Sequence, residues 1–372
     1  MKYYIIAGEA SGDLHGSNLV KQLIIEDPNA VIRCWGGDLM KAAGATLVKH
    51  YKDLAFMGFI EVVKNLPTIL KNLSFCKNEI EGYHPDVIVL IDYPGFNIKI
   101  AEWAKEKYYR VVYYISPQVW AWKEKRVHTI KKTVDLMLVI LPFEKDYYKK
   151  FDYHVEYVGH PLVEVIERFK SLPRKPIETA KKIIALLPGS RKQEISKKLP
   201  IMLAVSKSFP DYQFIVASAP GLTTDFYAPY MQPYSNVSMV SNQTYQLLKQ
   251  ASAALVTSGT ATLETALFGV PEVVCYKGNP ISYAIAKRVI KIKYISLVNL
   301  IMDKPIVKEL IQDNLTEENC TKELQALLYN EDRRSQIRKD YADLSSLLSK
   351  GGHASANAAK LIYDFVTKDP VK

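Results

Sequence analysis

Residues 87–91, Val-Ile-Val-Leu-Ile, form an unbroken aliphatic run that constrains the fold more than any other segment. A strand with one face in water alternates apolar and polar residues, so a run without alternation favours a strand buried on both faces. Such strands belong to parallel sheets whose two faces are covered by helices. Pro-Asp precedes the run and Asp-Tyr-Pro-Gly follows it, which bounds a short strand. The segment therefore predicts an α/β fold.

Further strand candidates, with helical patterns between them, occur in two series. The first comprises residues 3–7, 31–35, 110–115, 136–141 and 155–158, and the second comprises residues 183–187, 213–217, 237–240, 253–257 and 272–276. A charged, proline-containing stretch at 171–176 separates the series. Alternating strands and helices predict parallel sheets, and 372 residues suffice for about two domains. We therefore predict α/β domains over residues 1–170 and 176–345, and a final helix at residues 353–366 that packs back on the first domain.

The charge balance and the cysteines narrow the class of protein. Lys and Arg number 49 against 39 Asp and Glu, a net charge of +10 with neutral His. This excess favours an anionic partner, namely a phosphate-bearing substrate, a nucleic acid or an acidic lipid surface. The four cysteines lie far apart without a CxxC pair, which argues against a zinc site or a disulfide framework and suits a reducing cytosol. The apolar runs are too short to cross a bilayer or to form a signal peptide.

In open α/β sheets ligands bind at the carboxyl ends of strands, and the segment 257–264 has the composition of a phosphate site there. It follows a predicted strand and opens a helix, whose free N–H groups favour an anion. Hydroxyls supply further donors, glycine permits close backbone approach, and a glutamate could accept hydrogen bonds from ribose. The alternative is an ordinary helix N-cap. The candidate residues are Ser258, Gly259, Thr260, Thr262 and Glu264.

Ser190 and Arg191 follow the first predicted strand of the second domain, within the sequence Leu-Pro-Gly-Ser-Arg-Lys. A guanidinium matches phosphate oxygens as a two-pronged donor, so we predict that this segment clamps a diphosphate. The alternative is a strand-to-helix loop with a solvated basic residue.

Asp92 directly follows the buried run of the first domain, and Asn97 lies shortly after it. A carboxylate at the carboxyl end of a strand is well placed to act as a general base, and burial would raise its pKa toward the working range. The alternative is a turn aspartate that caps the next helix, and both roles can coexist.

The glycine-rich stretch 8–16 is a second candidate in the first domain, and we predict it to be a loop. It matches neither G-x-G-x-x-G nor a Walker A motif, which argues against a Rossmann dinucleotide enzyme and a P-loop ATPase. Its glycines would instead let a substrate approach the backbone. The alternative is that its aspartate only caps a helix. The candidate residues are Glu9, Ser11, Gly12, Asp13 and His15.

Three further segments combine apolar or aromatic residues with cations. Residues 116–122 hold two of the four tryptophans close to Lys and Arg, which suits binding of a sugar, an acyl chain or a nucleic acid, but also core packing. Residues 56–73 have the apolar spacing of a helix that lies either in a membrane interface or against a core. Residues 287–295 would either attract an anionic membrane or form the solvated face of a helix.

Taken together and in order, seven segments resemble the lipid-A-disaccharide synthase family. They lie at residues 8–16, 91–97, 116–122, 141–144, 158–161, 187–191 and 258–264, and the resemblance extends from residue 1 to roughly residue 310. It implies the GT-B type of glycosyltransferase fold, with two Rossmann-like domains that face a central cleft. It also implies catalysis without a metal or a cofactor.

The resemblance implies an activity and its place in the cell. Family members join a donor, UDP-2,3-diacylglucosamine, to an acceptor, 2,3-diacylglucosamine 1-phosphate, and form a β-1,6-linked tetraacyl disaccharide 1-phosphate and UDP. They act in lipid A biosynthesis in the cytoplasm of Gram-negative bacteria, bound peripherally to the anionic inner face of the inner membrane. On this basis we expect no nucleic-acid partner, and both a monomer and an oligomer stay open.

We expect a single inverting displacement, in which a base takes the proton of the acceptor's 6-hydroxyl while UDP leaves from the opposite face. By resemblance Asp92 is the leading candidate for this base, with His15, Asp13 and Glu9 as alternates. A well-placed general base accelerates a reaction by about 10²–10⁴-fold. Helix N–H groups and an arginine would stabilise the leaving diphosphate.

Three residues of the second domain match the family's nucleotide-side motifs. Arg191 matches the arginine of a Pro-Gly-Ser-Arg segment, and Lys277 matches a basic residue that follows a strand. Asn299 matches the asparagine of a Ser-Leu-Pro-Asn-Leu segment, although Val298 replaces the proline here.

Two rival functions remain at this point. A sugar-nucleotide 2-epimerase shares the two-domain architecture and would rearrange a UDP-sugar without an acceptor. A non-catalytic basic module would bind DNA or RNA with strong salt dependence and would not respond to UDP. The lysines are scattered and no nucleic-acid-binding motif is visible, so the basic module is the weaker rival.

Overall fold

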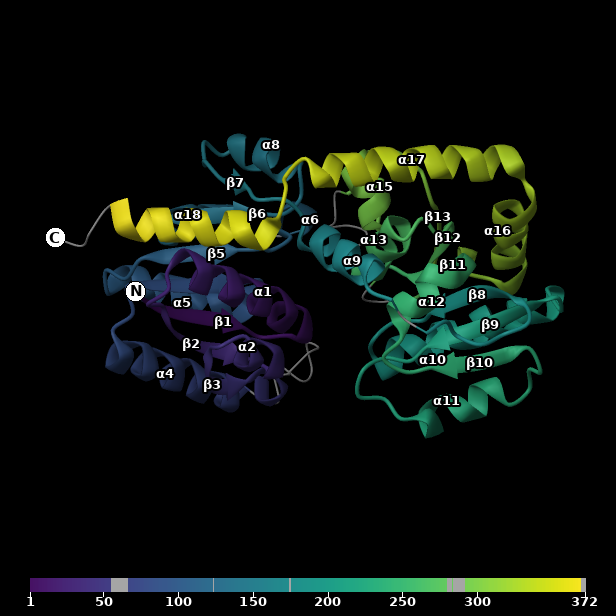
Figure 1. The fold of residues 1–372 in the computed structure, drawn as a ribbon, viewed down its shortest axis with the longest axis horizontal. Coiled ribbons are helices and arrows are strands. Elements are labelled where there is room, and N and C mark those ends of the chain that lie inside the picture. Colours follow the sequence, from purple (N-terminus) through teal and green to yellow (C-terminus); the bar gives the residue numbers. More distant parts are fainter. Residues whose placement is uncertain (55–65, 123, 174, 280–282, 284–291, 369–372) are drawn as a thin grey trace. The chain divides into compact units, whose positions relative to one another are not determined.

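The computed structural model describes all residues except 55–65, 123, 174, 280–282, 284–291 and 369–372. The chain forms two compact units (Figure 1). Unit 1 comprises Met1–Pro161 and Leu348–Lys372, and unit 2 comprises Leu162–Leu347. Each unit contains one parallel β-sheet flanked by helices. The predicted α/β class is therefore confirmed.

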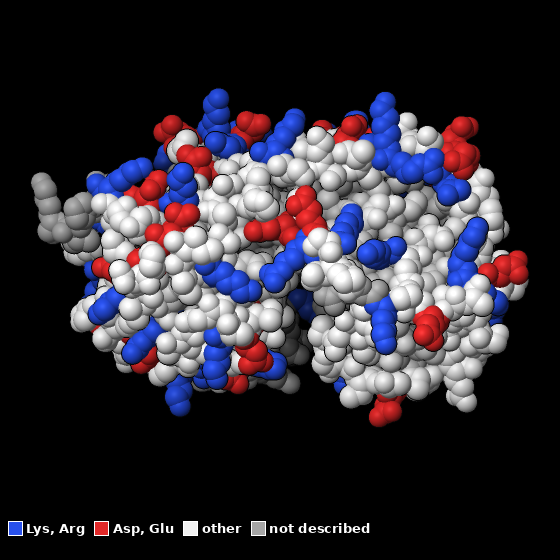
Figure 2. Space-filling view, in the orientation of Figure 1, with Lys and Arg blue, Asp and Glu red and all other residues white. Residues whose placement is uncertain are grey.

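Basic and acidic side chains are intermixed on the drawn face of both units (Figure 2). On the face drawn in Figure 2, Lys and Arg lie scattered among Asp and Glu, so the excess of positive charge is not gathered into one continuous patch on that face. Among the helices that the structure describes, none is both long and apolar enough to cross a bilayer.

The sheet of unit 1 has seven parallel strands in the order β3-β2-β1-β4-β5-β6-β7. The strand order reverses between β1 and β4, because the chain builds outward from β1 in one direction and then returns to add β4 on its other side. The strands are β1 (Lys2–Ala7), β2 (Val31–Gly36), β3 (Thr46–His50), β4 (Val87–Ile91), β5 (Val111–Tyr114), β6 (Leu136–Val139) and β7 (Glu156–Tyr157).

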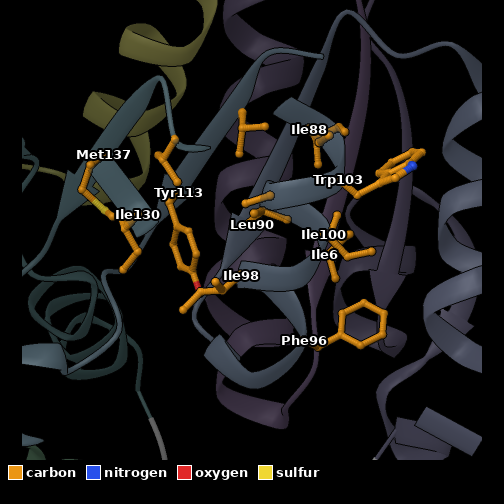
Figure 3. Packing of buried hydrophobic residues seen from close by; sticks show 14 of the residues in the cluster. Ile6, Ile88, Leu90, Phe96, Ile98, Ile100, Trp103, Tyr113, Ile130 and Met137 are labelled. Carbon is orange, nitrogen blue, oxygen red and sulfur yellow. The ribbon is translucent and has the colours of Figure 1, made fainter. Parts of the chain in front are cut away.

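Both faces of this sheet are buried, as the aliphatic run predicted. Along β1, Tyr4 and Ile6 belong to one hydrophobic cluster, and Tyr3 and Ile5 belong to another. Figure 3 shows part of the first cluster, where Ile6 packs with residues of β4 and of α5 (Pro94–Glu106). The described helices of unit 1 are α1 (Ala10–Glu26), α2 (Asp38–Ala42), α4 (Leu66–Tyr83), α5 (Pro94–Glu106), α6 (Val119–Trp122), α7 (Arg126–Thr133), α8 (Glu144–Lys149) and α18 (Ala354–Lys368).

The last helix, α18, belongs to unit 1 although it follows unit 2 in the sequence. Ile362 and Val366 of α18 join the cluster that contains Tyr3, and the Arg110 guanidinium donates a hydrogen bond to the carbonyl of Val366 at 2.7 Å. Gly159 has φ +96°, and a Cβ there would lie 2.8 Å from the carbonyl oxygen of Gly352. Glycine is required at this crossing because the two backbones approach so closely.

Unit 2 has six parallel strands in the order β10-β9-β8-β11-β12-β13, so its order reverses between β8 and β11. The strands are β8 (Lys182–Leu187), β9 (Tyr212–Ala217), β10 (Val237–Val240), β11 (Ala251–Thr257), β12 (Glu272–Tyr276) and β13 (Lys308–Ile311). The helices in the described part of this unit are α9 (Pro161–Ser171), α10 (Lys192–Ala204), α11 (Thr224–Met231), α12 (Thr244–Gln250), α13 (Thr260–Leu267), α15 (Leu297–Met302), α16 (Glu317–Tyr329) and α17 (Glu331–Ser349).

The first division between the units falls after Pro161, the first residue of α9, whereas we expected the first domain to continue to residue 170. The aromatic ring of Phe169 in α9 lies 5.3 Å from that of Tyr245 and 5.9 Å from that of Phe268. The Lys170 ammonium donates to the carbonyl of Leu267 at 2.7 Å. These contacts pack α9 against unit 2. The charged stretch 171–176 therefore belongs to unit 2 and does not separate the two units.

Candidate functional site

A pocket of about 410 Å³ lies in unit 2 at the carboxyl ends of β8, β9 and β11. The strand order of this sheet reverses between β8 and β11, next to the pocket. Such a position is the usual ligand site in open α/β sheets. Residues of both segments predicted to bind phosphate line it, so the structure brings the two segments together. The predicted residues in the lining are Ser190, Arg191, Ser258, Gly259, Thr260 and Glu264.

The turn between β11 and α13 is shaped by glycine and by hydroxyl groups. Gly259 has φ +148°, a backbone conformation that side chains with a Cβ rarely adopt. The buried Thr262 hydroxyl donates to the carbonyl of Gly259 at 2.8 Å, so Thr262 holds the turn and is absent from the pocket lining. The Ser258 hydroxyl donates to the carbonyl of Ile295 at 2.8 Å. The first N–H groups of α13, which begins at Thr260, lack partners within the helix and suit an anion.

The pocket carries an exposed guanidinium and two carboxylates. Arg191 Nη1 lies 3.4 Å from Glu194 Oε1. The Tyr245 hydroxyl donates to Glu264 Oε1 at 2.7 Å. Burial raises the pKa of Glu264, and the hydrogen bond from Tyr245 opposes that shift. Among these groups, Arg191 offers donors to a phosphate, and Glu264 can accept from a hydroxyl.

Asn299 and Lys277, also predicted to bind substrate, do not line this pocket. Asn299 is fully buried in α15, and its amide exchanges two hydrogen bonds of 2.9 Å with the backbone of Val307. The same amide donates to Glu309 at 2.9 Å. This gives Asn299 a structural task, the joining of α15 to β13. Lys277 is half-buried and follows β12.

In unit 1, Asp92 lies at the carboxyl end of β4, next to the switch between β1 and β4. Asp92 and Tyr93 have φ values of +44° and +49°, and such a conformation costs about 1–3 kcal/mol per residue and is concentrated at functional sites. The Asp92 carbonyl accepts hydrogen bonds from the Tyr113 hydroxyl at 2.6 Å and from the Asn97 amide at 2.7 Å. The buried Asn97 therefore holds the turn that carries Asp92.

The surroundings of the Asp92 carboxyl group raise its pKa. Burial and, after it, the nearby carboxylate of Glu9 raise its pKa from 3.8 to about 6, while a hydrogen bond from the backbone of Tyr93 opposes the shift. A base with this pKa is ionised at pH 7 and still holds a proton strongly enough to assist a reaction. The structure thus brings Glu9 and Asp92 together.

Residues 10–16 are helical, which corrects our expectation of a loop over 8–16. Helix α1 begins at Ala10, directly after the extended Glu9, so Ser11, Gly12, Asp13 and His15 belong to its first turns. The glycines serve packing: a Cβ on Gly12 would lie 3.1 Å from that of Ala7, and one on Gly16 would lie 2.6 Å from the sulfur of Met40. Glycines in this segment therefore allow close packing of α1 and do not form a loop.

The side chains of Asp13 and His15 differ in their surroundings. Asp13 is buried and accepts three backbone N–H bonds at the start of α2, from Gly37 at 2.8 Å, Met40 at 3.0 Å and Leu39 at 3.2 Å. It therefore caps α2. Burial lowers the pKa of His15 to about 4, so its imidazole is neutral at pH 7. Among the described residues, His15 Nδ1 has no hydrogen-bond partner.

The aromatic segment 116–122 is partly tied to the fold of unit 1. The indole of Trp120 donates to the buried Glu144 at 3.2 Å and packs edge-on against Phe143, with ring centroids 5.1 Å apart. The apolar stretch 56–65 and most of the basic stretch 287–295 lie outside the described residues. Of the latter stretch, Lys293 is exposed and pairs with Asp303 at 2.9 Å.

Sequence reasoning missed three residues beside the pocket of unit 2: Glu194, Lys198 and Tyr245. Glu194 lines the pocket, and the buried Lys198 donates to the hydroxyl of Thr257, another lining residue. The sequence does contain a signal for Glu194 and Lys198. They follow Arg191 at helical spacing, and residues three or four apart share one face of a helix.

Comparisons with known proteins agree with this geometry. The family model described as "Lipid-A-disaccharide synthetase" matches residues 3–363. The chain is 36% identical to the lipid-A-disaccharide synthase of Geobacter metallireducens, over 98% of this chain and 97% of that protein. It is 38% identical to that of Syntrophus aciditrophicus, over 98% of this chain and 97% of that protein.

Among solved structures, UDP-GlcNAc 2-epimerase from Neisseria meningitidis, bound to UDP-GlcNAc, superimposes with a TM-score of 0.67 and 13% identity, covering 99% of this chain and 100% of that one. At this identity the likeness concerns the fold alone, and it supports a pair of Rossmann-like domains of the GT-B type. The sequence relatives go further than the fold. The chain belongs to the lipid-A-disaccharide synthase family.

Proposed function

We propose that the chain transfers the sugar of UDP-2,3-diacylglucosamine to 2,3-diacylglucosamine 1-phosphate, forming a β-1,6-linked tetraacyl disaccharide 1-phosphate and UDP. The observation that carries this proposal is the pocket of unit 2, where the two segments predicted to bind phosphate meet at the switch point of the sheet. Family membership supports the reaction class, and the lining of the pocket supports binding of a nucleoside diphosphate there.

On the donor side, the diphosphate would lie against the first N–H groups of α13 and near Arg191. Both are donors that become more favourable as the leaving UDP gains negative charge, and such preorganised donors lower the barrier. Glu264 would accept from a ribose hydroxyl. These groups belong to the chain itself, and we propose that turnover needs no metal and no cofactor.

On the acceptor side, Asp92 would take the proton of the 6-hydroxyl as this oxygen attacks the anomeric carbon and UDP leaves from the opposite face. Its pKa of about 6 and its fixed backbone support this role. Glu9 and the neutral His15 remain alternates. Asp13 is the weakest candidate, because both of its oxygens accept N–H bonds from α2 or the residue before it.

We further propose peripheral binding to the anionic inner face of the inner membrane, from the cytoplasm. Both substrates carry acyl chains and phosphate, so the enzyme must reach them at a lipid surface, and a net charge of +10 favours an anionic one. The face drawn in Figure 2 has no continuous basic patch of the kind that a nucleic-acid-binding surface would present.

The test incubates the purified protein with both substrates, with and without a chelator, and measures disaccharide and UDP. We expect both products in equal amounts in both arms. Release of a rearranged UDP-sugar without acceptor would indicate the epimerase instead. Loss of product with the chelator would refute metal independence alone. Salt-sensitive binding to DNA or RNA, with no product, would refute the transferase.

A further inference from the structure

A buried lysine lies directly beneath the pocket of unit 2. Lys198 is 2% exposed, and no other Lys or Arg in the described part of the chain is buried. Its ammonium donates to the hydroxyl of Thr257 and lies 3.8 Å from Glu194 Oε2. Lys198 itself does not line the pocket, whereas Thr257 and Glu194 do.

An ammonium group in this position needs a compensating anion. Removing a charge from water is strongly unfavourable unless an opposite charge lies close by. Burial lowers the pKa of Lys198, and the carboxylate of Glu194 acts in the opposite direction and favours the charged form. Glu194 is the carboxylate within ion-pair distance of this ammonium.

The negative charge of Glu194 is unfavourable in a pocket that binds a diphosphate. Its carboxylate lines the cavity and would repel phosphate oxygens if nothing offset its charge. Its Oε1 lies 3.4 Å from Arg191 Nη1, so the carboxylate also competes with a diphosphate for that guanidinium. Its other oxygen, Oε2, faces Lys198. The carboxylate thus lies between an exposed cation and a buried one.

The loop of Gly189 leaves room for this arrangement. A Cβ on Gly189 would lie 3.1 Å from Glu194 Oε2 and 3.4 Å from Lys198 Nζ, and its φ is +121°. The absence of a side chain lets the carboxylate and the ammonium meet directly behind the backbone that lines the pocket.

We propose that Lys198 is a positioning residue that offsets the charge of Glu194 from below, and so weakens both the competition of Glu194 for Arg191 and its repulsion of a nucleoside diphosphate in the pocket. The inference rests on the proposed function in that UDP is taken as the ligand of this pocket. Lys198 acts through Glu194 and does not itself touch the ligand.

The test compares binding of UDP and of uridine to the full-length protein by calorimetry. For Lys198→Met we expect UDP binding to weaken by about 10- to 100-fold, because an uncompensated carboxylate then faces the diphosphate. Uridine, which has no phosphate, should bind as before. For Glu194→Gln we expect UDP to bind at least as tightly as to the wild type. The double variant should bind UDP within about threefold of the wild type, because both charges are gone.

The exposed neighbour Lys197 provides a matched control, and Lys197→Met should leave UDP binding unchanged. Thermal unfolding shows whether each variant is folded. If Lys198→Met alone does not fold, UDP binding by the double variant and by Glu194→Gln still tests whether Lys198 acts through Glu194. Equal losses for UDP and uridine, no rescue in the double variant, or a tenfold loss in Glu194→Gln would each overturn the inference. Failure of the wild type to bind UDP would instead overturn the proposed function.

Discussion

Replacing Asp92 by Asn should make the protein more stable and nearly inactive at the same time. The side chains are almost isosteric, and asparagine tolerates the left-handed backbone at this position, with φ +44°, better than most residues do. The change therefore removes the charge and the basic group and leaves the turn intact. Turnover should fall by about 10²–10⁴-fold if Asp92 is the general base.

The expected stabilisation follows from the pKa. Burial and the Glu9 carboxylate raise the pKa of Asp92 from 3.8 to about 6, and each pKa unit corresponds to about 1.4 kcal/mol. The ionised group thus lowers the free energy of unfolding by up to about 3 kcal/mol. The folded state binds this proton more tightly than the unfolded state, so this contribution makes the wild type lose stability as pH rises from about 4 to about 6. The variant Asp92→Asn should not lose stability in this way as the pH rises.

Tryptophan fluorescence can isolate the effect, because all four tryptophans, at positions 35, 103, 120 and 122, lie in unit 1 with Asp92. Urea unfolding of both proteins at pH 4 and pH 8 gives the difference in the free energy of unfolding. We expect little difference at pH 4 and an advantage of about 2–3 kcal/mol for the variant at pH 8. A difference independent of pH, or a less stable variant at pH 8, would refute the reasoning, and near-normal turnover would remove Asp92 from the base role.

Three other substitutions test the remaining parts of the site. Arg191→Ala should weaken UDP binding by about tenfold or more in calorimetry, and unchanged donor kinetics would contradict the diphosphate clamp. Gly8→Ala would place a Cβ 2.3 Å from the ring of Tyr93, so we expect a loss of about 1–3 kcal/mol in unfolding experiments and slower turnover. Asn299→Ala should lower the free energy of unfolding of unit 2 by about 2–4 kcal/mol, because Glu309 and the backbone N–H and carbonyl of Val307 lose their hydrogen-bond partner. Circular dichroism measures this unfolding, and an unchanged midpoint would contradict the structural role of Asn299.

The central strands could be predicted from sequence, and two edge strands could not. The run 87–91 is short and lies between Pro-Asp and Asp-Tyr-Pro-Gly, which favours a strand buried on both faces over a helix. Strands β3 and β13 lie at sheet edges, where one side has no partner strand and charged residues are tolerated. Their sequences, Thr-Leu-Val-Lys-His and Lys-Glu-Leu-Ile, accordingly lack a sustained apolar pattern.

Phosphate-binding segments were easier to predict than the residues that support them. Ser190, Arg191 and Gly259 follow strands directly, so chain order alone places them at the carboxyl edge of the sheet. Asn299 and Asp13 carry polar groups typical of binding sites, and only the folded structure shows that α2, α15 and β13 use those groups internally. Lys198 resembles any surface lysine in the sequence, because its burial depends on contacts with residues 59 positions away in the chain.

Glu9→Gln separates two explanations for the unusual pKa of Asp92. If Glu9 only raises that pKa by its charge, its removal lowers the pKa of Asp92, and the acid limb of the pH–rate profile moves to lower pH while turnover at pH 8 is kept. If Glu9 is itself the base, the same change removes turnover at every pH. Glu102→Gln, an exposed change on α5, provides the control and should leave the profile unmoved. An acid limb that stays in place while turnover is normal would show that the Glu9 carboxylate does not act on Asp92, and burial alone would then have to account for the shift.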